Sequence, residues 1–251
     1  MNDMRVRSYL REFLAAAVDL VYPVKCVVCG NFQERYLCEN CLARIEEVGD
    51  YVCDRCGAPC LDSVCSQCRE MPPAFESARA IGTYGGVLHD AICALKYNSK
   101  TPVAHELAQL MISYALCHSH LIEGIEVIVP VPIHYTRERS RGFNQADLLA
   151  APLAEALGVP LLRGVLVRNR ATKSQVDLDW DERRENVRGA FGVRQSELVV
   201  GRTILLIDDV LTTGSTSDNA ARALLNGGAK AVKVLNVGET VLTGSCNPRE
   251  S

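Results

Sequence analysis

The chain has 251 residues, of which 48% are hydrophobic and 23% charged, and its formal net charge is −3 at pH 7. That length can bury an α/β core of about 150–200 residues and leave a smaller module beside it. The composition is typical of a soluble globular protein. The negative net charge excludes a protein that holds nucleic acid by bulk positive charge, while a local basic surface stays compatible with it.

The first 24 residues predict an amphipathic helix, because Leu10, Phe13, Leu14 and Val18 share one helical face. The apolar run around Leu14 is short and is broken by Asp19, so it fits neither an export signal nor a membrane span. No other segment approaches the roughly 18 uninterrupted apolar residues that a span requires. We therefore expect a cytoplasmic protein with reduced thiols and without a membrane-spanning segment.

Residues 25–72 contain nine of the twelve cysteines, and eight of these form four Cys-x-x-Cys knuckles. Each knuckle lets two thiolates reach one metal ion, and a second knuckle completes a tetrahedral site. The segment therefore predicts a double zinc ribbon with two structural zinc ions, whose binding would supply the folding free energy of a module with little core. The predicted ligands are Cys26, Cys29, Cys38, Cys41, Cys53, Cys56, Cys65 and Cys68.

The spacing of the knuckles leaves their pairing open. The first two and the last two knuckles can each hold one ion, or the pairs can interleave; in both schemes we expect Cys60 to be a bystander. Disulfides and an iron–sulfur cluster are less favoured alternatives in a chain with reduced thiols. A closed site of four thiolates has no open coordination position, so we assign the module no catalytic role.

Beyond the join at Met71-Pro72-Pro73, residues 78–243 alternate predicted strands and helices, which favours an α/β domain with a parallel sheet. The most strongly apolar of the strands precedes two aspartates. Strands are predicted at Ala78–Tyr84, Val127–Val131, Leu161–Val167, Thr203–Ile207 and Ala231–Val237, and helices at Leu88–Leu95, Pro102–Leu116, Gln145–Leu157 and Thr216–Leu225.

A cluster of arginines follows the short strand that ends in Val-Pro-Val-Pro. Arg139 and Arg141 are expected on a loop at the edge of the sheet where open α/β proteins bind ligands, and they are candidates to clamp a diphosphate. A solvated charged turn is the alternative. Lys96 is a further candidate cation near the same site.

The strand Thr203–Ile207 is expected to bring Asp208 and Asp209 to the edge of the sheet, and a Thr- and Ser-rich loop then enters a helix. Backbone N–H groups, hydroxyls and the positive end of the helix predict a phosphate site, where Gly214 lets the backbone approach the anion. Two carboxylates beside a phosphate fit ribose hydroxyls or a magnesium ion held through water. An ordinary strand–turn–helix and a phospho-acceptor pocket are the alternatives, and the absence of a Walker sequence excludes a P-loop ATPase.

The segment Ile204–Thr216 resembles the phosphoribosyl-pyrophosphate (PRPP) signature of type I phosphoribosyltransferases. The resemblance implies that Asp208 and Asp209 contact the ribose hydroxyls and that magnesium accompanies PRPP. It implies that Arg139 and Arg141 belong to the pyrophosphate loop. Arg170 and Lys173 then lie in a loop that closes over substrate, although an exposed hairpin is nearly as well supported. The implied phosphate contacts are Thr212, Thr213, Gly214, Ser215 and Thr216.

In combination, the motifs over about residues 10–240 resemble the ComF family: the cysteine knuckles, Leu-Lys-Tyr, Val-Pro-Val-Pro with Arg-Gly-Phe-Asn-Gln, and Ile-Asp-Asp-Val-Leu-Thr-Thr-Gly-Ser-Thr. The resemblance implies a type I phosphoribosyltransferase sheet behind an N-terminal double zinc ribbon. It implies a role in DNA uptake and utilisation, with PRPP, single-stranded DNA and other uptake proteins, including a helicase, as partners. A magnesium-dependent phosphoribosyltransferase acting on an amine or base is the first alternative, and a PRPP-sensing regulator the second.

Overall fold

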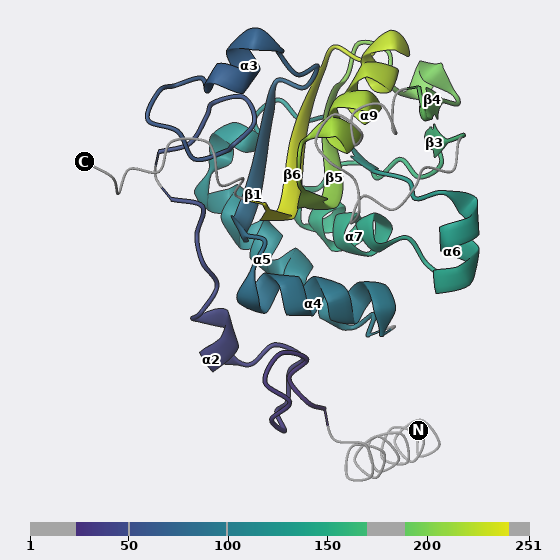
Figure 1. Ribbon diagram of the computed structural model, residues 1–251. Helices are drawn as coiled ribbons and strands as arrows, with labels where there is room; N and C mark the ends of the chain where they lie inside the picture. Colours follow the sequence, from purple (N-terminus) through teal and green to yellow (C-terminus); the bar gives the residue numbers. More distant parts are fainter. Residues whose placement is uncertain (1–23, 50, 99, 170–188, 241–251) are drawn as a thin grey trace, which may run out of the picture.

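The computed structural model describes residues 24–49, 51–98, 100–169 and 189–240 (Figure 1). The predicted N-terminal helix, Arg170 and Lys173 therefore lie outside the described residues. The helices are α2 (Glu39–Leu42), α3 (Ser66–Glu70), α4 (Gly86–Tyr97), α5 (Val103–Cys117), α6 (Tyr135–Arg141), α7 (Gln145–Leu157) and α9 (Ser215–Asn226), with 3-10 turns at Ser119–Leu121 and Ser196–Leu198. The strands are β1 (Ser77–Thr83), β2 (Val127–Pro130), β3 (Leu166–Arg168), β4 (Phe191–Val193), β5 (Thr203–Leu211) and β6 (Ala231–Glu239).

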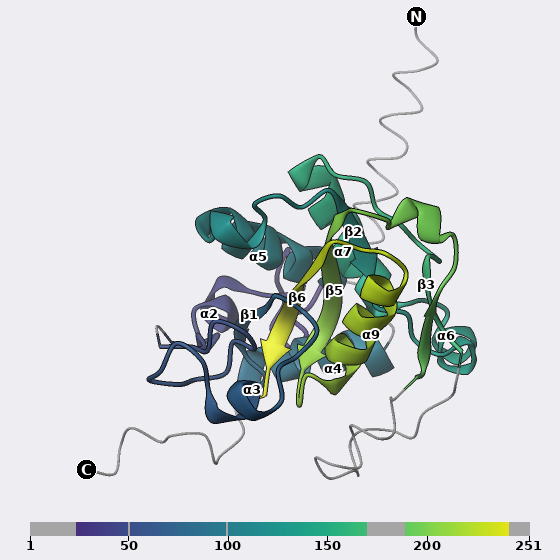
Figure 2. The same cartoon turned by 90° about the horizontal axis from the view of Figure 1, so that it is seen from above.

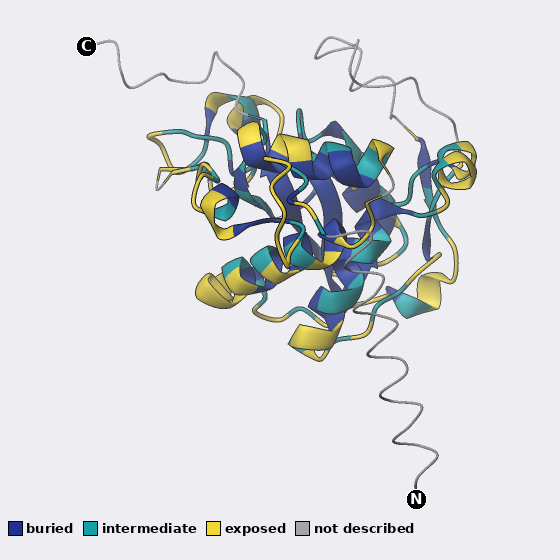
Figure 3. Cartoon of the chain, turned by 90° about the horizontal axis from the view of Figure 1, so that it is seen from below, coloured by how far each residue is buried: buried dark blue, intermediate teal, exposed yellow. Residues whose placement is uncertain are grey.

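The main sheet has the order β1-β6-β5-β2, and every pair in it is parallel. Side chains of β5 alternate between two cores: Leu205 and Ile207 pack toward α4, α5 and α7, whereas Ile204 and Leu206 pack toward α9. Figure 2 shows α5 and α7 on one side of the sheet and α9 on the other. The strands are buried while the outer faces of the helices are exposed (Figure 3), as in other parallel sheets covered on both faces.

The predicted strand Leu161–Val167 is wrong in its extent. Leu161 makes only an isolated parallel bridge to Ile128, and the strand that forms, β3, runs from Leu166 to Arg168 and pairs antiparallel with β4. Gly164 lies between the two parts with φ of 72°, a conformation that turns the chain away from the main sheet.

The two zinc ribbons lie against the edge strand β1 and the adjacent helices. The backbone N–H of Thr83 donates to the carbonyl of Glu46, between the ribbons, and that of Ala78 donates to the carbonyl of Arg55 in the second ribbon, both at 2.7 Å. These bonds cover the free edge of the sheet, which would otherwise present unpaired backbone groups. None of the helices in the described ranges is both long and apolar enough to cross a membrane.

Candidate functional site

The eight predicted zinc ligands form two separate clusters, and within each cluster the ligand atoms lie within 4.8 Å of one another. One cluster contains Cys26, Cys29, Cys38 and Cys41, and the other contains Cys53, Cys56, Cys65 and Cys68. The sequential pairing of knuckles is therefore the one that forms. The Sγ atoms of Cys29 and Cys38 are 3.8 Å apart. This matches the about 3.8 Å separation that tetrahedral geometry requires for Zn–S bonds of about 2.3 Å.

Backbone donors surround the thiols of the second cluster. The N–H groups of Cys65 and Cys68 point at Cys53 Sγ and Cys65 Sγ, at 3.3 and 3.4 Å. Burial by itself raises the pKa of Cys53, but backbone N–H groups lower it, and the resulting pKa is about 7. The pKa of Cys56 is raised by its hydrogen bond to Cys68, and burial raises that of Cys65 to about 11, so among these three thiols Cys53 ionises most readily. Cys60 belongs to neither cluster, and its thiol donates to the carbonyl of Asp62.

The two aspartates lie on β5 itself, because the strand continues beyond the predicted Ile207 and pairs with β6 as far as Leu211. Asp208 and Asp209 are both buried, with 8% and 5% exposure. Burial, followed by the charge of Asp209, raises the pKa of Asp208 to about 7. Two acids in this position are costly for the folded protein unless a ligand supplies hydrogen-bond donors.

Lys96 comes to this acid pair from α4. Its Nζ lies 2.9 Å from Oδ1 of Asp209, whereas the buried Oδ2 of Asp209 has no hydrogen-bond partner among the described residues. Burial opposes the charge of Lys96, yet the attraction of Asp209 and Asp208 raises its pKa above the ordinary value. The site therefore holds one ion pair and one carboxylate oxygen that is free to accept.

The loop after β5 turns into α9 at Gly214, which has φ of 73° and precedes the first helical residue, Ser215. The Thr213 hydroxyl is 2.8 Å from the Ser215 hydroxyl and accepts from the Ser215 N–H at 3.4 Å. The start of α9 is the positive end of the helix dipole, so the loop and the helix end suit an anion. We call residues Thr212–Thr216 the phosphate loop.

Arg139 and Arg141 lie on the helix α6 and not on a loop, which corrects the expected setting of both residues. His134 caps the helix by accepting from the Thr136 N–H, and Gly142 ends it with φ of 85°. Arg139 is exposed, whereas Arg141 donates to the Gln145 side chain at 2.6 Å.

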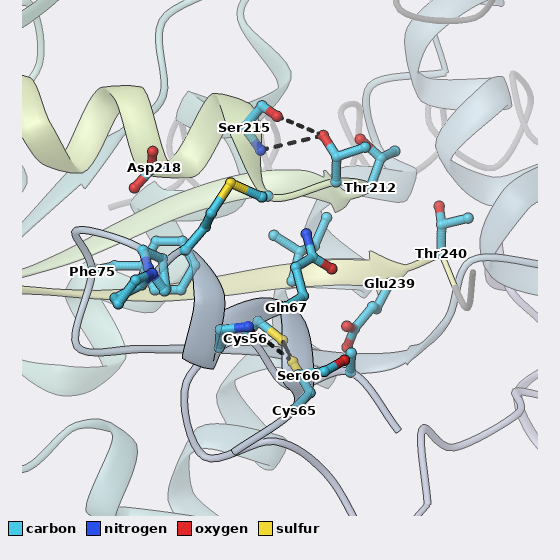
Figure 4. Close-up of a pocket in the computed structure, with 18 residues that line it drawn as sticks. Cys56, Cys65, Ser66, Gln67, Phe75, Thr212, Ser215, Asp218, Glu239 and Thr240 are labelled. Atoms are coloured by element: carbon cyan, nitrogen blue, oxygen red, sulfur yellow. Dashed lines mark hydrogen bonds between the residues drawn. The ribbon is translucent and has the colours of Figure 1, made fainter. Parts of the chain in front are cut away.

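Two features of the site were not predicted from the sequence. Arg168, at the end of β3, is close enough to Asp208 for its positive charge to lower the pKa of that acid. It also lines a hollow of about 450 Å³ beside β2, together with Pro130 and Asn144. The second feature is a cavity of about 340 Å³ between the second zinc ribbon and the phosphate loop (Figure 4). Its walls come from segments far apart in the chain, so no local pattern could reveal it.

Residues 17–70 match the double zinc ribbon domain, and residues 139–237 match the phosphoribosyl transferase domain. The DNA utilization protein YhgH of Escherichia coli K12 is 34% identical over 79% of this chain and 88% of its own length. The chain belongs to the ComF family. Competence protein F of Haemophilus influenzae is 30% identical over 84% of this chain and 94% of its own length. Competence protein ComFC of Bacillus subtilis is 27% identical over 78% of this chain and 80% of its own length.

ComF-family membership agrees with the predicted architecture, a type I phosphoribosyltransferase sheet with a double zinc ribbon before it. Among solved structures, an allosteric regulatory enzyme of purine biosynthesis is 23% identical over 54% of this chain and 26% of that chain, with a TM-score of 0.36. Adenine phosphoribosyltransferase of Trypanosoma brucei is 14% identical over 63% of this chain and 74% of that chain, with a TM-score of 0.37. These similarities are remote.

Proposed function

We propose that the chain binds PRPP with magnesium at the carboxyl edge of β5 and acts in DNA utilisation, in contact with single-stranded DNA. One observation carries the proposal for PRPP: a buried acid pair with an unsatisfied oxygen lies directly before a loop that offers donors at the start of α9. A ligand that fits must have hydroxyl donors at one end and an anion at the other. A phosphorylated ribose meets both requirements.

In the proposed complex, Asp208 and Asp209 accept hydrogen bonds from the ribose hydroxyls, and the phosphate loop holds the 5′-phosphate. Magnesium would neutralise the pyrophosphate group, and the same two carboxylates are the groups that would hold it through water. Lys96 keeps part of the negative charge of the acid pair balanced, because its Nζ contacts Asp209 at 2.9 Å. Without that cation, two ionised acids would repel an incoming phosphate.

The part of the proposal that concerns DNA rests on the names of the relatives, which describe DNA utilization and competence. The surface that suits a single strand is formed by α6 and the end of α4. It exposes Tyr97 and Tyr135, each 69% accessible, near Arg139 and Arg141. The guanidinium of Arg141 lies 5.8 Å from the ring centre of Tyr97. Exposed rings can stack on bases while arginines contact the phosphates, in a protein that we propose to be cytoplasmic.

Phosphoribosyl transfer is the second candidate function, and the cavity beside the phosphate loop favours it. A transferase needs room for an acceptor next to the phosphorylated sugar, and about 340 Å³ is available there. In that reaction the acceptor nitrogen would form a bond to the sugar carbon as the bond to pyrophosphate breaks. Release of pyrophosphate on adding candidate amines or bases would favour transfer over binding alone.

The acid pair can be tested by titrating PRPP and Mg²⁺ into the wild-type protein and into Asp208→Asn/Asp209→Asn by calorimetry. We expect the double variant to bind at least about tenfold more weakly, because ribose hydroxyls lose charged acceptors. Glu155→Gln/Glu197→Gln is the matched control, since it removes two exposed acids outside the proposed site. Unchanged affinity in the aspartate variant, with both zinc ions retained, would sink the ribose assignment.

A further inference from the structure

Lys96, in the last turn of α4, places its ammonium group against the acid pair. The helix α4 packs on the same face of the sheet as Ile207. Side chains alternate along a strand, so Asp209, two residues further on, points toward that helix. Nζ of Lys96 lies 2.9 Å from Oδ1 of Asp209, and the two side chains are only 17% and 7% exposed. Little water reaches the contact, so the attraction between the two charges is screened weakly.

The charge of Lys96 serves both acids. Burial disfavours an ammonium group, but the attraction of Asp209 and Asp208 outweighs it and raises the pKa of Lys96, which is therefore charged at neutral pH. One positive charge beside two carboxylates leaves the buried group with at most one net negative charge. The acid pair therefore needs an added cation much less than two unpaired acids would.

The acid pair also offers few free oxygens to a metal ion. Oδ1 of Asp208 accepts from the backbone N–H of Asp209 at 2.9 Å, and Oδ1 of Asp209 accepts from Lys96. Magnesium requires a nearly ideal octahedron of oxygen ligands. In the described part of the chain, only the two cysteine clusters bring three or more candidate ligands within 4.8 Å of one another. A magnesium ion at the acid pair would therefore depend on water and on the phosphates of its ligand.

Lys96 also determines which oxygen of Asp209 is left for a ligand. Because the ammonium group holds Oδ1, Oδ2 is the oxygen that stays buried without a partner among the described residues. A neutral hydroxyl can donate to this oxygen without adding charge to the site. Lys96 is thus a positioning residue, which orients one carboxylate and balances its charge without having to contact the sugar.

We propose that Lys96 supplies at the acid pair the positive charge that a metal ion would otherwise supply, so that the phosphorylated ribose binds without magnesium. The inference rests on the proposed function, because it concerns the hydroxyls from which Asp208 and Asp209 accept. Magnesium is then needed by the pyrophosphate group of PRPP, whose charge it neutralises, and not by the sugar. Ribose 5-phosphate and PRPP should therefore differ in their dependence on magnesium.

Manganese tests the acid pair in the absence of any sugar. Mn²⁺ prefers the same carboxylate and water ligands as Mg²⁺, and its electron paramagnetic resonance signal distinguishes bound from free ions. We expect the zinc-loaded wild type and Asp208→Asn/Asp209→Asn to bind equal amounts of Mn²⁺, because Lys96 already balances the pair. An additional Mn²⁺ site in the wild type that the aspartate variant lacks would overturn the proposal, whether or not the protein binds ribose.

Calorimetry with ribose 5-phosphate, with and without Mg²⁺, tests the consequence for the sugar. We expect magnesium to change the affinity of the zinc-loaded wild type by less than about twofold, since the sugar needs no metal ion. Lys96→Met should bind at least about tenfold more weakly without magnesium, because two unbalanced acids repel the phosphate, and added Mg²⁺ should restore most of this loss. Lys230→Met is the matched control, since it removes an exposed lysine directly before β6 and should behave like the wild type.

The outcomes separate the role of Lys96 from the proposed function. Binding of ribose 5-phosphate to the wild type only with Mg²⁺ would refute the metal-independent site and keep the ribose assignment. A folded Lys96→Met variant with both zinc ions that binds as tightly as the wild type, or gains nothing from Mg²⁺, would also overturn the role of Lys96. If that variant does not fold, the wild-type measurements decide the question. No binding with or without Mg²⁺ would refute the proposed function itself, and this inference with it.

Discussion

Asp208 and Asp209 occupy adjacent positions on β5, and both are buried at the proposed PRPP site. The sequence was sufficient to predict this pair because two acids directly after an apolar strand have no packing role. Lys96 was predicted only as a nearby cation, and its contact with Asp209 depends on how α4 packs. Arg168 was not predicted as a site residue because its approach to Asp208 depends on where β3 packs.

The cost of the acid pair should appear in the pH dependence of stability. The pKa of Asp208 is raised from 3.8 to about 7, so between these values the folded protein holds a proton that the unfolded chain has released. Stability therefore falls as pH rises through this window. Asp208→Asn mimics the protonated acid, and its advantage in free energy of unfolding over the wild type should grow by about 1 kcal/mol between pH 6 and pH 8.

Urea unfolding of the zinc-loaded protein without PRPP measures this difference. The range stays above pH 6 because protonated thiols release zinc. Asp147→Asn is a useful comparison, since burial also raises the pKa of that acid but away from β5. The difference in free energy of unfolding between Asp208→Asn and the wild type is the decisive quantity. If this difference stays constant or shrinks from pH 6 to pH 8, Asp208 is already ionised below pH 6 in the folded protein.

At the scale of elements, the sequence predicted the knuckles, the strands of the main sheet and the helices between them, because periodic burial and metal spacing are local signals. It could not predict how the ribbons dock. That contact depends on backbone groups, such as the bond from Thr83 N–H to the carbonyl of Glu46, which any residue type can make. The helix α6 was predicted as a loop because its exposed polar residues, none of them buried, have no apolar periodicity.

Gly82 tests the docking of the segment between the ribbons on β1. A Cβ at this position would lie 2.6 Å from the carbonyl oxygen of Glu46, so Gly82→Ala must push the segment away. We expect a loss of about 1–3 kcal/mol in the free energy of unfolding, measured by denaturant titration, with zinc content retained. Gly85→Ala is the control, because nothing lies within 4 Å of its added Cβ. Equal stability of the two variants would contradict the docked arrangement.

Glu106 of α5 anchors the first ribbon, since its two carboxylate oxygens accept from the N–H groups of Tyr36 and Leu37 at 2.6 and 2.7 Å. Glu106→Ala should loosen only that ribbon, so a chelator should remove one zinc equivalent several-fold faster and leave the other rate unchanged. Glu126→Ala removes a similar carboxylate-to-backbone bond, to Thr203, at the main sheet. Biphasic zinc release in Glu106→Ala but not in Glu126→Ala supports the anchor, and identical release curves would refute it.

For the whole molecule, the second ribbon and the loop after β5 border the same cavity. The ribbons cover the β1 side, the acid pair lies on β5, and the phosphate loop follows that strand. The helix α6 comes directly after β2, the strand at the other edge of the sheet. The molecule has a net charge of −3, so any contact with DNA must be local and sensitive to salt.

Arg139→Ala/Arg141→Ala should therefore weaken binding of a labelled single-stranded oligonucleotide. Each lost phosphate contact should reduce the slope of log K against log salt by about 0.7, or about 1.4 for both. Arg202→Ala/Lys230→Ala removes the same charge next to the starts of β5 and β6, opposite to the carboxyl edge, and is expected to leave the slope unchanged. Fluorescence anisotropy over a salt series measures the slope for each double variant. Equal slopes in the two variants would rule out α6 as the DNA contact.

Asp208 and Asp209 are the residues that we propose to hold the hydroxyls of a phosphorylated ribose. The most direct measurement is a calorimetric comparison of ribose 5-phosphate with 2-deoxyribose 5-phosphate on the wild-type protein. We predict that the ribose compound binds at least about tenfold more tightly, because the deoxy compound leaves a buried carboxylate oxygen without a donor. Equal affinities for the two sugars would contradict the claim.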